Sequence, residues 1–187
     1  MNNPQYIFSM YKLSKIYTGG KQVIKDISLS FLPGAKIGVL GDNGAGKSTL
    51  LKIMAGLDKE YNGEAKLVDG IKVGYLAQEP ELNNDLNVYE NVMEGMAEAK
   101  KLVDDFNTIS LKFSEDLTDE EMNDTIVKQG ELQEQIDNLD AWDLDRKAEI
   151  AMDALSLPPG ESRINYLSGG EKRRVALAQL LLSNPDF

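Results

Sequence analysis

The 187-residue sequence has no cysteine and no histidine, and aromatic residues make up only 7% of it. Without cysteine the chain cannot form a disulfide framework, and without either residue it cannot build a cysteine/histidine metal cluster. Its longest unbroken apolar run, residues 175–178, is much shorter than the roughly 20 residues that cross a bilayer. These absences exclude a disulfide-stabilised secreted scaffold and a membrane-spanning chain, and they predict a protein of the cytoplasm.

Hydrophobic residues nevertheless make up 42% of the chain, enough for a sizeable core. This share excludes a chain that is disordered throughout. The length fits one domain and leaves little room for a second one.

Charge is concentrated in one acidic segment, residues 94–149. The net charge of the chain is −11, and this segment carries 17 acidic and 6 basic residues, while the rest of the chain carries 14 of each. Such a segment is either a linker or an inserted helical element with a solvated face. Apolar residues recur in it at roughly helical spacing, namely Val127, Leu132, Ile136 and Leu139. Turn-prone residues at 114–119 and a glycine at Gly130 predict a helix, a break and a second helix, that is, a helical hairpin.

Strand-like runs dominate the first third of the chain. Residues 6–13 and 23–31 are predicted strands, separated by a turn at Thr18-Gly19-Gly20. Residues 36–40 are a candidate short buried strand, and residues 63–75 are predicted to form a hairpin around an Asp-Gly turn.

Two further segments have helical patterns. Residues 47–55 follow a glycine-rich stretch and end before Gly56, a residue typical of helix C-termini. Residues 171–182 lie between a Gly-Gly pair and an Asn-Pro pair, which predicts a helix bounded at both ends.

The glycine-rich stretch, residues 41–48, fits the phosphate-loop pattern G-x-x-x-x-G-K-[ST] at each fixed position. Its glycines allow the backbone to aim N–H groups at phosphate oxygens, and the following helix adds the partial positive charge of its N-terminus. Lys47 is predicted to reach the β- and γ-phosphates, and the Ser48 hydroxyl to bind Mg²⁺. A glycine-rich turn could match by chance, but the predicted strand before it and helix after it favour nucleotide binding. The candidate nucleotide-binding residues of this loop are Gly41, Asp42, Asn43, Gly44, Ala45, Gly46, Lys47, Ser48 and Thr49.

A second motif, Leu167-Ser168-Gly169-Gly170-Glu171, precedes three basic residues and an apolar helix. Taken alone, it is an ordinary helix N-cap with an acidic residue in the first turn. Together with the phosphate loop, it resembles the signature motif of ATP-binding cassette proteins. The resemblance implies that Ser168, Gly169 and Gly170 contact a phosphate of the nucleotide held by another cassette.

Two single residues fit the same resemblance by their positions. Gln78, in the sequence Tyr75-Leu76-Ala77-Gln78-Glu79-Pro80, resembles the family's Q-loop glutamine, which approaches Mg²⁺ and the γ-phosphate. Tyr17, 24 residues before Gly41, resembles the aromatic residue that stacks on adenine. An isolated glutamine in such a loop would mean little by itself, and a lone tyrosine can equally be a packed strand residue.

The resemblance covers nearly the whole chain, residues 1–187, as the first part of one ATP-binding domain. It implies an α/β P-loop NTPase fold with an antiparallel β-subdomain, a nucleotide-binding α/β core and a helical subdomain. It also implies that ATP and Mg²⁺ bind between the phosphate loop of one cassette and the signature motif of a second cassette, in a parent protein that is an ATPase.

The last residues, 184–187, stand where the next strand begins in the family. That strand carries a Mg²⁺-binding Asp and the catalytic Glu, with a His later on. The resemblance therefore implies that this stretch of sequence lacks the Walker B strand and the catalytic residue on it, and we expect little hydrolysis by the chain alone.

The distance between the motifs narrows the family. Gln78 and Ser168 are 90 residues apart, more than a transporter cassette usually needs for its helical subdomain. The excess coincides with the acidic segment, an arrangement similar to the arm insertion of the ABC-F family, soluble proteins with two tandem cassettes that act on ribosomes. The resemblance implies a coupling of the ATP state to translation elongation. The ATPase subunit of a membrane transporter would carry both motifs equally well, and an ABC-F protein that protects against antibiotics is a third alternative.

The charge of the acidic segment makes it a poor partner for RNA, because RNA phosphates attract lysine and arginine. If the segment contacts the ribosome, we expect a basic ribosomal protein as its partner. RNA contacts, if any, would use basic residues of the segment, namely Lys100, Lys101, Arg146 and Lys147. A solvated helical hairpin with no partner is the alternative.

Overall fold

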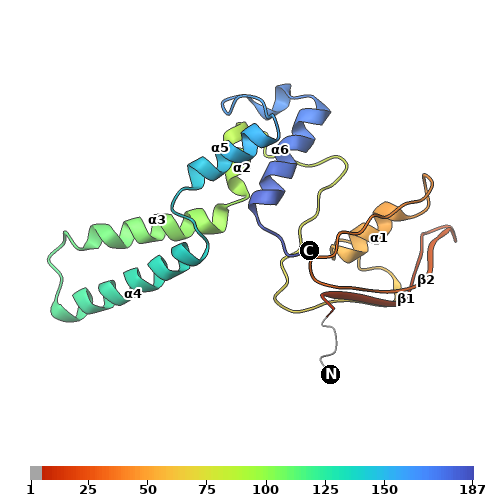
Figure 1. Ribbon diagram of the computed structural model, residues 1–187, viewed down its shortest axis with the longest axis horizontal. Helices are drawn as coiled ribbons and strands as arrows, with labels where there is room; N and C mark the ends of the chain where they lie inside the picture. The colour runs from red at the N-terminus through yellow and green to blue at the C-terminus, as the bar shows by residue number, and fades with distance from the viewer. Residues whose placement is uncertain (1–5) are drawn as a thin grey trace. The chain divides into compact units, whose positions relative to one another are not determined.

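The computed structural model describes residues 6–187, which form two compact units. The first unit runs to Tyr75 and includes Asn184–Phe187; the second is Leu76–Ser183. In Figure 1 the first unit holds the strands and helix α1, and the second holds helices α2 to α6.

The sheet of the first unit has three antiparallel strands in the order β2-β1-β3. The strands are β1 (Phe8–Ile16), β2 (Gln22–Phe31) and β3 (Asn62–Leu67). The two strands predicted at residues 6–13 and 23–31 are confirmed, with the first displaced toward the C-terminus. The predicted turn between them is confirmed as well, and both of its glycines have the positive φ that such a turn demands.

An irregularity in β1 decides which of its side chains face the core. Phe8 and Met10 are buried, and the register against β2 then slips before Leu13, with Lys12 at a φ of 49°. Because of this bulge, Leu13 and Lys15 return to the buried side instead of the solvent side. Lys15 is thereby only 4% exposed, which is unusual for a lysine.

Helix α1 (Lys47–Met54) confirms the helix predicted at residues 47–55. After its last turn, Gly56 adopts a φ of 71°, and the amide of Leu57 donates to the carbonyl of Lys52, so the helix closes in a Schellman motif. The helix contributes its buried side to the apolar core of the first unit. This core consists of Ile7, Phe8, Met10, Leu13, Ile24, Phe31, Leu50, Ile53 and Met54.

The prediction of a buried strand at residues 36–40 is wrong. The segment forms no strand, and Ile37, Val39 and Leu40 are 55%, 37% and 94% exposed. A strand needs a neighbour that completes its backbone hydrogen bonds, and no segment among residues 6–187 supplies one. The parallel sheet expected for the α/β core is therefore not formed within the described residues.

The hairpin predicted at residues 63–75 is also wrong, because only its first strand, β3, forms. The returning residues pair with the end of the chain instead. The amide of Gly74 donates to the carbonyl of Phe187 (2.7 Å), while the amides of Asp186 and Phe187 donate to the carbonyl of Lys72 (2.8 and 3.2 Å). These bonds have the pattern of two parallel strands. Residues 72–74 therefore pair with residues 186–187 and not with β3, as the predicted hairpin would require.

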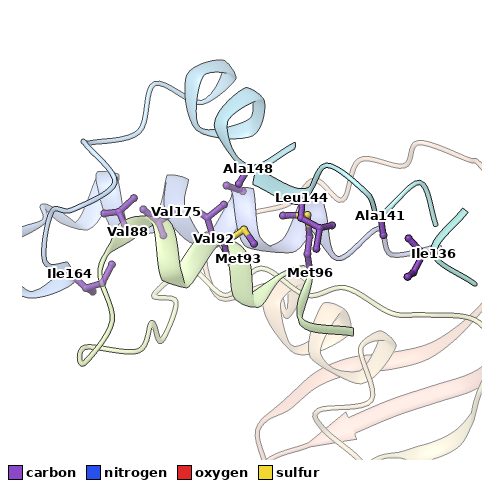
Figure 2. Close-up of a cluster of buried hydrophobic side chains, with 11 residues drawn as sticks. Val88, Val92, Met93, Met96, Ile136, Ala141, Leu144, Ala148, Ile164 and Val175 are labelled. Carbon is purple, nitrogen blue, oxygen red and sulfur yellow. The ribbon is translucent and has the colours of Figure 1, made fainter. Parts of the chain in front are cut away.

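The second unit is helical. Its elements are α2 (Val88–Glu94), α3 (Ala97–Lys112), α4 (Asp119–Asn138), α5 (Leu144–Ala154), the 3-10 turn η1 (Ile164–Tyr166) and α6 (Gly169–Leu182). Figure 2 shows the core of this unit: side chains of α2, α5 and α6 lie together, and Ile136 of α4 lies next to Ala141. Helix α6 confirms the helix predicted at residues 171–182, except that it begins two residues earlier, with the Gly-Gly pair in its first turn. No helix in residues 6–187 is both long and apolar enough to cross a membrane.

Helices α3 and α4 lie side by side as a helical hairpin, as the acidic segment predicted (Figure 1). The break falls at residues 113–118, where Thr118 and Glu121 cap the start of α4. Gly130 lies inside α4 with open space around it and breaks nothing, because one exposed glycine costs a helix only about 1 kcal/mol. Of the four apolar residues predicted to share a face, Leu132 and Ile136 are buried, but Val127 and Leu139 are exposed.

Candidate functional site

The phosphate loop, residues 41–48, runs into α1 through three glycines with positive φ. The φ angles of Gly41, Gly44 and Gly46 are 157°, 85° and 93°. At Gly46 a side chain is excluded by space as well, because a Cβ would lie 2.6 Å from the carbonyl oxygen of Val23 in β2. The loop therefore presses against the sheet at the point where the helix begins.

The N-terminus of α1 carries no group of its own to neutralise it. Gly46 is the N-cap, so no side chain caps the helix, and its first turn contains no acidic residue. The amide of Leu50 is the first to bond within the helix, to the carbonyl of Gly46 (2.9 Å). The amides of Lys47, Ser48 and Thr49 thus point out of the helix end with its partial positive charge, an arrangement that binds anions such as phosphate.

Lys47 adds a full positive charge to this helix end. Its Nζ donates to the carbonyl oxygens of Gly41 (2.6 Å) and Asp42 (2.8 Å), so the ammonium spans the loop. The Ser48 hydroxyl next to it is exposed. Residues 6–187 contain no cluster of three acidic side chains that could hold a metal, but Mg²⁺ in nucleotide sites needs one or two protein oxygens besides phosphates and water. The loop therefore fits a triphosphate with Mg²⁺.

Tyr17 lies beside this loop in the same unit. Its hydroxyl is 3.0 Å from Oγ1 of Thr49 in α1, and the Nζ of Lys15 lies 5.2 Å from the centroid of its ring. Lys15 is in turn held by Asp58 at 2.9 Å. This hydrogen bond raises the pKa of Lys15 and lowers the pKa of Asp58, so both are charged at neutral pH. Tyr17 is 42% exposed, so its ring is fixed in place yet open to a flat ligand.

Ser168 caps α6 in the second unit through a complete capping box. Its amide and its hydroxyl both donate to Oε2 of Glu171 (2.8 and 2.7 Å), and the amide of Glu171 donates back to the Ser168 hydroxyl (3.3 Å). These bonds lower the pKa of Glu171, which keeps it ionised. A Cβ at Gly169 or Gly170 would meet nothing within 4 Å. Packing within the described chain therefore does not require these glycines, and they leave room for a close approach from outside.

Gln78 is exposed in the loop that precedes α2. Its carbonyl oxygen accepts a hydrogen bond of 2.7 Å from Nε of Arg173 in α6. The structure thus brings Tyr17 to the phosphate loop in the first unit, and Gln78 to the signature helix in the second unit.

Three residues of these surroundings were not found by sequence reasoning. Lys15 and Asp58 were missed because the bulge that turns Lys15 inward leaves no signal in the sequence. Arg173 stands in an ordinary basic run, and nothing in its spacing indicates a contact 95 residues away along the chain.

Comparison with known proteins agrees with the geometry. The family model described as ABC transporter matches residues 24–187. The chain is 53% identical to the energy-dependent translational throttle protein EttA of Mycobacterium tuberculosis, over 98% of the chain and 32% of that protein. It is 34% identical to the tylosin resistance ATP-binding protein TlrC of Streptomyces fradiae, over 99% of the chain and 34% of that protein. The chain thus spans about a third of the length of the curated relatives it matches.

A solved structure supports the fold. CbiO1 of Clostridium perfringens, described as part of the ABC transporter complex CbiONQ, matches with a TM-score of 0.55 at 20% identity. The match covers 96% of this chain and 62% of that one.

Proposed function

Since the chain belongs to the ABC transporter family, we propose that residues 41–48 bind the triphosphate of ATP together with Mg²⁺. The observation that carries this proposal is the uncapped N-terminus of α1 with the ammonium of Lys47 beside it. Lys47 would neutralise the charge of the β- and γ-phosphates, and Ser48 would supply an oxygen ligand to Mg²⁺. Bound Mg²⁺ supplies charge neutralisation between the phosphates. The family match confirms the resemblance drawn from the two motifs.

We propose that the Tyr17 ring stacks on adenine. Its position beside Thr49 supports this role, because the base of a nucleotide lies one ribose away from phosphates held at the start of α1. Lys15 lies over the ring and helps to orient it.

Replacing Tyr17 by alanine is expected to weaken ATP binding about 10-fold, because one aromatic stacking contact with a base contributes about 1–3 kcal/mol. Tyr17→Phe keeps the ring and loses only the bond to Thr49, so its affinity should stay within about threefold. Titrations with ATP and with inorganic tripolyphosphate distinguish the contribution of the base to binding from that of the phosphates. Equal losses for both ligands would contradict the stacking role, since tripolyphosphate has no base.

We propose that Ser168, Gly169 and Gly170 bind the nucleotide of a second cassette. The open space at both glycines supports this, because a phosphate can approach the N-terminus of α6 closely. The curated relatives are about three times as long as the chain, which leaves room for that second cassette in a longer ATPase.

We propose further that the longer protein is an ABC-F ATPase of the cytoplasm that binds ribosomes and couples its ATP state to translation elongation. The identity of 53% to a translational throttle protein, against 34% to a resistance protein, favours a throttle over an antibiotic-protection role. Gln78 would report the γ-phosphate and its Mg²⁺ to the rest of the protein.

The acidic segment, residues 94–149, which contains the hairpin of α3 and α4, is the proposed arm toward the ribosome. Its surface is mostly acidic, and Lys147 is already paired with Asp140 at 2.9 Å. A basic ribosomal protein therefore fits this surface better than RNA. The exposed basic residues that could contact RNA are Lys100, Lys101, Lys112, Lys128 and Arg146.

Sedimentation with ribosomes tests the proposal. The full-length protein, with its catalytic glutamate changed to glutamine, is expected to pellet with ribosomes in ATP and to stay in the supernatant in ADP. The same protein with Lys47→Ala is the control and should not pellet in either nucleotide. Absence of ribosome binding together with recovery in the membrane fraction would contradict the proposal and favour the ATPase subunit of a transporter.

A further inference from the structure

The loop from Gln78 to Asn87 is held at both of its ends by side chains of other elements. It contains no helix or strand, and it leads directly into α2. Since Gln78 stands at its start, whatever fixes this loop also fixes the proposed sensor of the γ-phosphate.

The downstream end is held by a buried amide. Asn91 in α2 is fully buried; its Oδ1 accepts from the amide of Asn83 (2.9 Å), and its Nδ2 donates to the carbonyls of Asn83 (3.0 Å) and Asn87 (2.8 Å). A buried side chain with its bonds satisfied in this way holds the backbone rigidly, because breaking any of them leaves a polar group unpaired.

The upstream end is held by the signature helix. Nε of Arg173 donates a hydrogen bond of 2.7 Å to the carbonyl oxygen of Gln78. Within residues 6–187, this bond ties Gln78 to the rest of the second unit. Arg173 stands five residues after Ser168, at the start of the second turn of α6. A charged donor makes this bond stronger than one between neutral groups. The carbonyl it holds belongs to the peptide unit that sets the direction of the Gln78 side chain.

We propose that Arg173 is a positioning residue that locks the Gln78 loop to the signature helix. This inference rests on the proposed function, in which Gln78 approaches the γ-phosphate and Ser168 binds the nucleotide of the second cassette. The lock then couples the Gln78 loop to the signature motif at Ser168. When the second cassette docks and α6 moves, the Arg173 side chain moves Gln78 with it. In this proposal Arg173 acts through the carbonyl of Gln78 and not by a contact of its own with the nucleotide.

Hydrogen exchange tests the lock, and steady-state kinetics tests its consequence. In the full-length protein, Arg173→Ala is expected to speed amide exchange in residues 76–82 about 10-fold, the lower end of the effect of one charge-assisted hydrogen bond, because this bond is exposed. The same variant should lower kcat for ATP hydrolysis about 10-fold with KM within about twofold, because the phosphate loop is untouched. Arg173→Lys, which keeps a donor, should recover part of kcat.

Arg174→Ala is the matched control, since it removes the neighbouring exposed charge and leaves the bond to Gln78 in place. It should leave both exchange and kcat within about twofold of wild type, as for other exposed charges. Unchanged exchange in Arg173→Ala would overturn the lock, and faster exchange with unchanged kcat would overturn the positioning role. A wild-type protein without ATPase activity would overturn the proposed function and the positioning role together, while the exchange data would still report on the lock.

Discussion

A Lys47→Ala variant is expected to bind ATP about 100-fold more weakly than the wild type. The ammonium of Lys47 is held by the carbonyls of Gly41 and Asp42, beside the amides at the start of α1. A hydrogen bond to a charged group contributes about 1.5–3 kcal/mol, and the upper end of this range applies to a lysine that contacts two phosphates. About 2.8 kcal/mol corresponds to 100-fold in Kd. Titration with a fluorescent ATP analogue measures this loss.

Lys52→Ala is the control for this variant. Lys52 is exposed and stands in the last turn of the same helix, away from the loop, so its loss removes one positive charge without touching the proposed phosphate site. Its ATP affinity should stay within about twofold of wild type. If Lys47→Ala bound ATP as tightly as Lys52→Ala, with equal thermal stability, the phosphate loop would not be the nucleotide site.

Replacing Gly95 by alanine is expected to destabilise the second unit strongly. Gly95 follows α2 and has an ordinary φ of −61°, but a Cβ there would collide with the backbone of α6, at the carbonyl oxygen of Gln179 and 2.9 Å from its carbonyl carbon. Because the obstacle is backbone, the two helices must separate, and Val92 and Val175 lose their full burial. Overpacking of this kind costs about 3 kcal/mol, which lowers the Tm by roughly 10 °C for a chain of this size.

Gly130→Ala, in contrast to Gly95→Ala, is expected to stabilise the second unit. Gly130 lies within α4 with open space around it, so the methyl group meets no neighbour. Alanine in an exposed helical position gains about 0.5–1 kcal/mol over glycine, which should raise the Tm by a few degrees. The fluorescence of Trp142, the single tryptophan, follows both transitions, since its ring packs edge-on against Phe106 in the same unit. If the Gly95→Ala variant had the same Tm as the Gly130→Ala variant, the close contact of α2 and α6 would be contradicted.

The local parts of the site could be predicted from the sequence. The pattern of residues 41–48 predicts both the loop and the helix after it, because glycine spacing and helix signals act over a few residues. Ser168 was predicted as an N-cap for the same reason, and the capping box is formed. The hairpin of α3 and α4 followed from apolar spacing and a turn-prone stretch between its helices.

The predictions that failed depended on partners far along the chain. Residues 36–40 are apolar enough for a buried strand, but a strand exists only where a neighbour completes its hydrogen bonds. Residues 63–75 contain a good hairpin turn, yet the returning segment pairs with residues 186–187. The sequence pattern of a segment indicates whether it favours the strand conformation. Which segment it pairs with depends on the other segments that the fold brings next to it.

Sequence alone therefore determined the local elements that carry the proposed chemistry: a glycine-rich loop that leads into a helix, a serine-capped helix and an acidic helical hairpin, all encoded in short stretches of residues. Only the tertiary structure decided which groups support that chemistry. A bulge in β1 turns Lys15 inward toward Asp58 and Tyr17, and the packing of α6 brings Arg173 to the carbonyl of Gln78. The contacts of Lys15 with Asp58 and of Arg173 with Gln78 join residues 43 and 95 positions apart, and they arise from burial and backbone geometry that no short stretch of sequence specifies.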